Sequence, residues 1–211
     1  MRKWCAILGL ASLESFALSL EQVQMDLQKN SIAKDSVEMN IKTTFHSAAG
    51  DQSVFTYFVQ KGKEKIYAEI KTPFANQRSI VNGKRIKTVN LNSGEFQIAP
   101  YQGETLEFLP DIHFARMDSG EWKEPKFLAD STFVIEGPDG TLFYNASKKR
   151  IEEMKSESFQ KTVNVKFSYD AANHLKSVTV KTSTQGLEST AVVDVLKLCH
   201  SKNFPDRLFE F

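Results

Sequence analysis

The sequence predicts a mainly β protein of the α+β class, an antiparallel meander that follows one N-terminal helix. Two observations carry this prediction. Segments with an apolar residue at every second position recur at intervals of about ten residues, which is typical of half-buried strands. Turn-forming pairs such as Asn82-Gly83 and Gln185-Gly186 separate these segments, so consecutive strands are expected to pair as hairpins.

The N-terminus has the features of a secretory signal peptide. Arg2 and Lys3 precede an apolar run from Trp4 to Leu13, and a stretch with small residues at the positions that signal peptidase reads ends at Ser19. The apolar run is shorter than the roughly 20 residues that span a bilayer. We therefore expect residues 1–19 to be removed on export and residues 20–211 to form a single domain.

Charge and cysteine content argue against nucleic-acid binding and against an internal disulfide or a cysteine zinc site. Loss of Arg2 and Lys3 lowers Lys plus Arg from 27 to 25, and loss of Glu14 lowers Asp plus Glu from 26 to 25, so the processed chain is formally neutral. Nucleic-acid-binding proteins carry a positive excess, which argues against that class. Cys199 alone remains after processing, so neither an internal disulfide nor a cysteine zinc site is expected, and we interpret it as a structural thiol.

A helix is expected from Leu20 to about Asp35, because Leu20, Val23 and Leu27 recur at helical spacing and neither Gly nor Pro interrupts them. From Ser36 onward the apolar period changes to two. We expect strands in residues 37–45, 52–62, 63–70, 95–100, 131–137, 141–146, 163–169, 174–182 and 187–198, in addition to the hairpin around Asn82-Gly83.

That hairpin, Ser79–Val89, is rich in cations and allows two registers. A two-residue loop pairs Ser79 with Ile86 and Val81 with Lys84, which places Val81 and Ile86 on the inner face and Arg85 and Lys87 on the outer one. A three-residue loop would divide the cations between the two faces. Because the processed chain is neutral, we interpret the segment as a structural hairpin with a solvated outer face rather than as a nucleic-acid site.

Residues 101–130 break the pattern. They contain two internal prolines and large apolar residues without a steady period, which is typical of a functional loop or lid and equally of short helices that pack on the sheet. The chain also contains 16 phenylalanines, which fit either a filled core or a sheet that curves around an apolar cavity.

The sequence shows no catalytic constellation. Its histidines, His46, His113, His174 and His200, lack the spacing of metal ligands, and neither a nucleophile elbow nor a glycine-rich phosphate loop is present. We therefore expect a protein that is not an enzyme and that uses no cofactor or metal.

The order of the motifs resembles the periplasmic outer-membrane lipoprotein carrier and sorting family (LolA-like). The resemblance rests on the signal peptide, the N-terminal helix, the stretch "VFTYFVQKGKEKIYAEIKTPFANQRSIVNGKRIKTVN" with Pro73 and its Ile-Val-Asn-Gly hairpin, and the closing "NFPDRLFEF". It covers most of residues 20–211 and is weakest between residues 101 and 130.

The resemblance implies a half-open, curved antiparallel barrel or sheet with a helical or loop lid over an apolar cavity. It further implies a monomeric, non-catalytic periplasmic carrier or chaperone for the acyl chains of lipoproteins or other lipids, which works between an inner-membrane release complex and an outer-membrane acceptor. The insertion would supply the lid through Leu106, Phe108, Leu109, Ile112, Phe114 and Met117.

On this basis the cavity and its lid are expected to be lined by apolar residues of the strands and of the insertion. They are Phe55, Tyr57, Ile70, Phe74, Val81, Ile86, Phe96, Ile98, Phe108, Phe114, Phe133, Phe143, Val165, Phe167, Val178 and Val180. Two alternatives remain open: an envelope-stress sensor or interaction module on the same fold, and an exported hydrolase that uses scattered carboxylates or His113.

Overall fold

A computed structural model describes residues 18–30, 36–47, 50–62, 64–102, 121–138, 140–200 and 203–211. The predicted signal peptide, apart from its last two residues, lies outside the described residues, and so does most of the predicted lid, with all six of the apolar residues assigned to it. The described elements are α1 (Leu20–Asn30), β1 (Ser36–Ser47), β2 (Gly50–Lys61), β3 (Lys65–Lys71), β4 (Asn76–Asn82), β5 (Arg85–Asn90), β6 (Phe96–Pro100), β7 (Lys126–Ala129), β8 (Thr132–Gly137), β9 (Gly140–Asn145), β10 (Arg150–Ser158), β11 (Lys161–Tyr169), β12 (Leu175–Thr184), β13 (Leu187–Cys199) and the 3-10 helix η2 (Asp206–Phe209).

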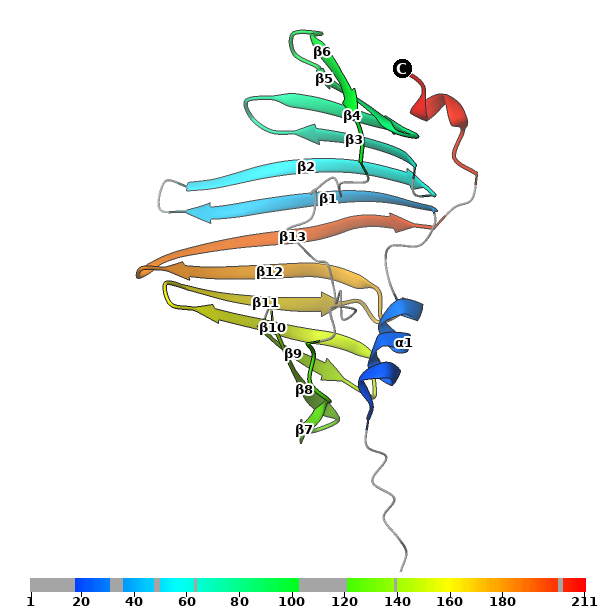
Figure 1. Ribbon diagram of the computed structural model, residues 1–211. Coiled ribbons are helices and arrows are strands. Elements are labelled where there is room, and N and C mark those ends of the chain that lie inside the picture. Colours follow the sequence, from blue (N-terminus) through cyan, green and yellow to red (C-terminus); the bar gives the residue numbers. More distant parts are fainter. Residues whose placement is uncertain are drawn as a thin grey trace, which may run out of the picture.

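All thirteen strands belong to one antiparallel sheet, in the order β6-β5-β4-β3-β2-β1-β13-β12-β11-β10-β9-β8-β7 (Figure 1). The chain meanders outward from β1 to β6 and then returns from β7 to β13. The last strand pairs with the first, so the two halves join in the middle of the sheet. β6 and β7 are the edge strands in the described part of the chain, so the sheet is open rather than a closed barrel. The predicted mainly β, half-open antiparallel fold is confirmed.

The strand predictions rest on alternation, and the structure shows why alternation was sufficient for most strands. In β1 the side chains of Val37, Met39 and Ile41 are buried in turn while the residues between them are partly exposed. β7 and β10 were not predicted as strands. β10 reads "RIEEMKSES", in which only Ile151 and Met154 are apolar, and an irregularity of register at Glu152 interrupts their period.

The hairpin of β4 and β5 has the face pattern expected for a two-residue loop, but its register differs. Val81 pairs with Ile86 and Asn82 with Arg85, so neither expected pairing, Ser79 with Ile86 or Val81 with Lys84, is formed. The loop residues are Gly83 and Lys84, not Asn82 and Gly83, and Gly83 has a φ of 60°. A positive φ at the first loop position but not at the second, Lys84, is typical of a type II′ turn, for which Gly is the preferred first residue.

α1 packs across one face of the sheet next to β10, and its first turn is capped from outside the helix. The Ser19 hydroxyl accepts a hydrogen bond from the backbone N–H of Gln22 at 3.2 Å, and the backbone N–H of Leu20 donates to Oε2 of Glu124 at 3.0 Å. The helix was expected to continue to about Asp35. It ends at Asn30, and residues 31–35 lie outside the described part.

The C-terminal segment packs on the other face of the sheet. The fully buried Phe209 of η2 lies in a cluster with Val59, Tyr67 and Ile80. Asp206 pairs with the ammonium groups of two lysines, Lys61 at 2.9 Å and Lys65 at 2.8 Å, and these hydrogen bonds lower the pKa of its carboxyl group to about 2. η2 therefore covers part of the face opposite to the one on which α1 lies.

Candidate functional site

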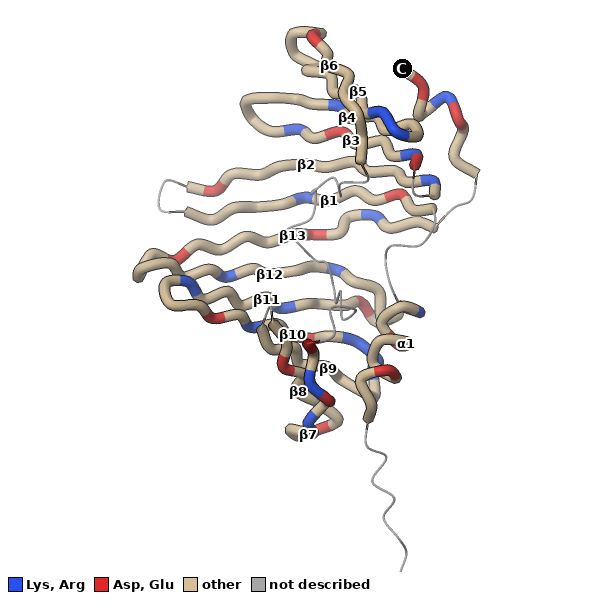
Figure 2. The backbone as a smooth tube through the Cα atoms, in the orientation of Figure 1, with Lys and Arg blue, Asp and Glu red and all other residues tan. Residues whose placement is uncertain are grey.

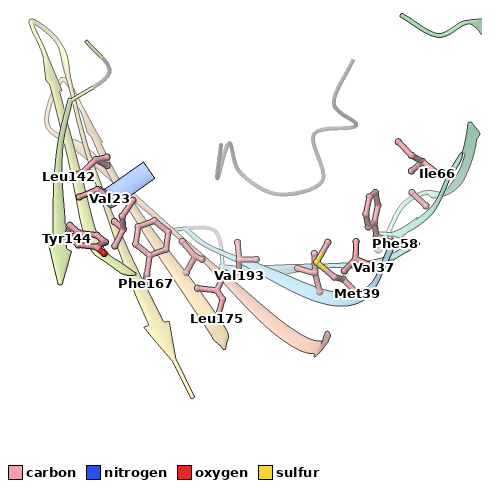
Figure 3. Packing of buried hydrophobic residues seen from close by; sticks show 14 of the residues in the cluster. Val23, Val37, Met39, Phe58, Ile66, Leu142, Tyr144, Phe167, Leu175 and Val193 are labelled. Atoms are coloured by element: carbon pink, nitrogen blue, oxygen red, sulfur yellow. The ribbon is translucent and has the colours of Figure 1, made fainter. Parts of the chain in front are cut away.

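The sheet is strongly curved, and its main apolar cluster lines the inside of the curve. Figure 3 shows Val37, Met39, Phe58 and Val193 pointing from the central strands into the concave side. Val23 of α1 belongs to the same cluster and is fully buried. The concave face is therefore the apolar side of the sheet, and α1 lies over one end of it.

Charge is segregated between the two faces. Seven strands that are consecutive in the sheet, β5, β4, β3, β2, β1, β13 and β12, are described over their whole length, and their paired concave positions carry apolar or uncharged polar side chains only. Lys176 of β12 lies at a register irregularity and has no paired position. The convex positions of the same strands carry the charged residues that Figure 2 marks along the tube: Glu38, Lys42, Asp51, Lys61, Lys65, Glu69, Lys71, Arg78, Arg85, Lys87, Lys181, Glu188, Asp194 and Lys197. The sheet thus presents one broad face whose paired positions carry no charge on these strands.

The concave face is not purely a packed core, because part of it is only half buried. Val165 of β11 and Val180 of β12 are cross-strand neighbours that pack against the buried cluster while remaining partly exposed. Met154, Ile86 and Val195 have the same character on other strands. Partly exposed aliphatic side chains around a buried base form the kind of surface that accepts an apolar ligand.

A polar clamp holds α1 against this face. Asp26 is only 4% exposed, and one of its carboxylate oxygens accepts a hydrogen bond from the hydroxyl of the fully buried Tyr144 at 2.9 Å. The other oxygen accepts one from Gln22 at 3.1 Å and lies 3.5 Å from the ammonium of Lys149. These contacts join the helix to β9 and to the β9–β10 turn.

These contacts determine the ionisation states of Asp26 and Tyr144. Burial by itself would raise the pKa of Asp26, but the hydrogen bonds from Tyr144 and Gln22 and the charge of Lys149 outweigh it, so the pKa lies below its usual 3.8. Burial and the adjacent carboxylate raise the pKa of Tyr144 well above its ordinary value. Asp26 is therefore an anion and Tyr144 a neutral donor at physiological pH.

Trp122 covers a second part of the concave side, over β8. Its side chain packs against the main cluster and lies directly on Gly137, where an added Cβ would come within 2.2 Å of the indole. Only a glycine permits this approach. Trp122 is thus a described residue of the predicted insertion that packs against the concave face.

The strand registers place eight of the sixteen predicted cavity residues on the concave face. They are Ile70, Val81, Ile86, Phe133, Val165, Phe167, Val178 and Val180. Val81 and Val178 are fully buried in the base of the face, and Val165, Val180 and Ile86 remain partly exposed. That these residues bind a ligand stays a prediction.

Five of the predicted residues lie on the convex face instead: Phe55, Tyr57, Phe96, Ile98 and Phe143. Phe55 and Tyr57 line a shallow convex hollow of about 340 Å³ together with Glu69, Lys71 and Leu196. The structure does not bring these five together with the concave residues, because each occupies the alternate position of its strand. Phe74 is at the tip of the β3–β4 turn, and Phe108 and Phe114 lie outside the described residues.

Several concave residues were not included in the prediction. Met39, Phe58 and Leu142 are buried in the main cluster, and Tyr144 and Asp26 form the clamp. The alternation of β1 signals Met39. No sequence pattern signals that Asp26 of the helix meets Tyr144, because 118 residues separate them.

In the described part of the chain, no group of three or more His, Cys, Asp or Glu side chains gathers as metal ligands do. Two of the histidines pair with carboxylates at exposed positions: His46 lies 2.8 Å from Asp51, and His174 lies 3.3 Å from Asp170. Within the same residues no helix is long and apolar enough to cross a membrane.

Comparison with known proteins gives a clear result for structure only. No protein-family model matches the sequence, and neither does any curated protein. A LolA superfamily protein from Nitrosomonas europaea is similar in structure with a TM-score of 0.57 and 14% identity, over 92% of this chain and 99% of that one. A domain from Vibrio parahaemolyticus, named for outer membrane lipoprotein sorting, is similar with a TM-score of 0.51 and 7% identity, over 89% of this chain and 94% of that one. The chain therefore has the fold of LolA superfamily proteins.

Proposed function

We propose that this protein is a non-catalytic carrier that shields acyl chains of lipoproteins or other lipids on the concave face of its sheet. The observation that supports this most directly is the absence of charge from the paired concave positions of seven consecutive strands. Exposing an acyl chain to water costs about 0.8 kcal/mol of free energy for each methylene group. A wide uncharged face with half-buried valines, such as Val165 and Val180, offers such a chain a place out of water.

The name of the Vibrio structure points in the same direction, since it refers to outer membrane lipoprotein sorting. By analogy we propose that the protein works as a monomer in the periplasm, where it receives lipid from an inner-membrane release complex and passes it to an outer-membrane acceptor. This part of the proposal rests on a likeness of fold.

Export requires the signal peptide that the sequence predicts in residues 1–19. Cleavage after Ser19 would give Leu20 a free ammonium group. The nitrogen of Leu20 already lies 3.0 Å from the Glu124 carboxylate, so the new charge would find a partner in place. The loss of the Ser19 cap would be offset in part by this ion pair.

The predicted insertion was 101–130, but its residues 126–129 form the edge strand β7, so we propose that only the part before Lys126 forms the lid over the concave face. Support comes from its described end, where Trp122 packs on Gly137 and against the main cluster. Tyr101, at the other end of the segment, packs against the same cluster. The described residues near both ends of the segment, Tyr101 and Trp122, therefore pack on the concave side.

The test is to look for lipid in protein that is expressed from the full-length gene and purified from the periplasm. Native mass spectrometry should detect the protein with bound lipid. A fluorescent fatty-acid probe should bind the delipidated protein and be displaced by palmitate.

Two matched variants locate the site. Val180→Asn introduces an amide on the concave face, and Val192→Asn introduces the same group at a partly buried convex position one strand away. We expect Val180→Asn to weaken probe binding about tenfold, because the amide would be buried without a partner. Val192→Asn should bind as the unaltered protein does. The proposal would be contradicted if the purified protein carried no lipid and did not bind the probe. It would also be contradicted if both variants lost probe binding equally.

A further inference from the structure

The two ends of the strands differ in character. α1 and η2 are both tied to one end, through Lys149 of the β9–β10 turn and through Lys61 and Lys65 beside the β2–β3 turn. Figure 1 shows both elements near that end of the sheet, and neither at the other. At the opposite end, the part of the chain that the structure describes has hairpin turns and no helix.

Large apolar side chains gather at this opposite end. Phe74 of the β3–β4 turn is 80% exposed, Phe159 of the β10–β11 turn is 100% exposed, and Leu187 beside the β12–β13 turn is 78% exposed. Phe45, close to the end of β1, is 47% exposed. We call these four residues the turn rim. In the described part of the chain, no exposed large apolar residue lies in the turns at the other end.

The stability of the fold does not explain why these exposed turn positions carry large apolar side chains. Phe159 and Gln160 form a two-residue hairpin loop, where Gly, Asn and Asp are the preferred residues, and a fully exposed phenyl ring contributes no burial. Phe74 stands on a turn that is built to be rigid. The Thr72 hydroxyl accepts hydrogen bonds from the N–H groups of Phe74 and Ala75 at 3.2 and 2.8 Å, and it donates to the carbonyl of Ala75 at 2.8 Å. The turn thus presents Phe74 to the outside in a fixed position.

The arrangement of the rim favours a lipid bilayer as its partner. From the β3–β4 turn to the β10–β11 turn the rim crosses six strand spacings, about 30 Å at the usual interval between strands. Its tips belong to separate turns, and polar residues such as Gln160 and Gln185 lie between them. A rigid protein surface would need a separate pocket for each tip, whereas the fluid boundary between headgroups and acyl chains accepts several separate apolar tips.

We infer that the turn rim docks the protein on a membrane surface by inserting Phe74, Phe159 and Leu187 into the boundary between lipid headgroups and acyl chains. Charges of both signs lie close to the strand ends at this side of the sheet: Lys71 and Lys161 are cations, and Asp51 and Glu188 are anions. The contact therefore depends on apolar insertion and not on the charge of the lipid. This inference goes beyond the carrier function, since it concerns an edge of the sheet and not the concave face.

Vesicle flotation tests the inference, with protein exported from the full-length gene and its N-terminus determined by mass spectrometry. The protein should float with phosphatidylcholine vesicles, and its partitioning should change less than twofold between 50 and 300 mM salt. Each of Phe74→Ser, Phe159→Ser and Leu187→Ser should lower partitioning about tenfold, since the burial of one such side chain is worth roughly one decade or more. The triple variant should not float.

The control is the double variant Leu128→Ser/Leu196→Ser, which removes exposed leucines that are 57% and 60% accessible on strand faces away from the rim. It should float as the unaltered protein does. All variants should keep their urea midpoints, because the altered side chains are exposed, and should bind the fatty-acid probe normally. Failure of probe binding in every variant would refute the carrier function and leave the flotation result standing.

Three outcomes would overturn the inference. The first is that the unaltered protein stays at the bottom of the gradient, and the second is that the control variant loses as much binding as the triple variant. The third is that no variant floats while sedimentation velocity shows self-association that the triple variant lacks, which would make the rim an interface between copies of the chain.

Discussion

Replacing Tyr144 with Phe removes one hydroxyl from the contact between α1 and the concave face. That hydroxyl donates to the carboxylate of Asp26, which is 4% exposed and so keeps little access to water. A hydrogen bond to a charged group contributes about 1.5–3 kcal/mol to stability. We therefore expect Tyr144→Phe to lower the free energy of unfolding by about 1.5–3 kcal/mol at pH 7.

The loss should depend on pH, because Asp26 titrates. Its pKa in the folded protein lies below the usual 3.8, so the ionised carboxylate stabilises the fold at every pH above 3.8. This stabilisation disappears as the pH falls through the folded-state pKa. The difference in stability between the unaltered protein and Tyr144→Phe should hence be constant from pH 5 to 8 and should shrink below pH 3.8.

Urea unfolding followed by circular dichroism at pH 7 and pH 3 measures both quantities. Tyr169→Phe is the matched control, because the Tyr169 hydroxyl donates to the uncharged carbonyl of Ile151 at 2.6 Å. Burial raises the pKa of Tyr169 to about 12, so this donor is neutral throughout. We expect a smaller loss of about 0.5–1.5 kcal/mol with no pH dependence. Unchanged stability in Tyr144→Phe at pH 7, or an equal loss at both pH values, would refute the reasoning.

Further predictions concern the glycines and the C-terminal helix. Gly83→Ala should cost about 1 kcal/mol in urea unfolding, because a left-handed φ of 60° in open space strains an alanine. Gly140→Ala should cost distinctly more, since its Cβ would also lie 2.2 Å from a backbone carbonyl oxygen of β10; equal losses would contradict this. Phe209→Ala should destabilise by about 3–5 kcal/mol, as expected for a fully buried ring, and a loss below 1 kcal/mol would show that η2 is not part of the folded unit. Gly137→Ala should displace Trp122 from β8 and shift the tryptophan emission to longer wavelength, and an unchanged spectrum would contradict the contact.

Most of the fold follows from local pattern. Alternation in β1 and β11 and turn residues such as Gln185-Gly186 are sufficient to predict hairpins, because a strand with one buried face must alternate and a tight turn requires a positive φ. β10 was missed for the same reason, since its charged composition and the irregular register at Glu152 hide the period. The hairpin of β4 and β5 shows what local pattern does not determine. The sequence placed Val81 and Arg85 on the correct faces of the sheet but placed the loop one residue too early.

The candidate site depends more on tertiary structure. Phe55 and Tyr57 are as apolar in the sequence as Phe58, yet they lie on the convex face, and Phe58 lies on the concave one. Both faces of β2 carry apolar residues, because η2 covers part of the convex face around Val59. The prediction chose Phe55 and Tyr57 from this strand and left out Phe58, because apolar character alone does not distinguish the two faces of a strand that is apolar on both.

The sequence by itself determined the period of most strands and the positions of most turns, because these depend on residues that are close together in the chain. Only the tertiary structure decided which face of the sheet is concave, that β1 pairs with β13, and that Asp26 meets Tyr144. The last two depend on contacts between segments more than a hundred residues apart. The curvature of the whole sheet then determines which set of alternating side chains faces inward.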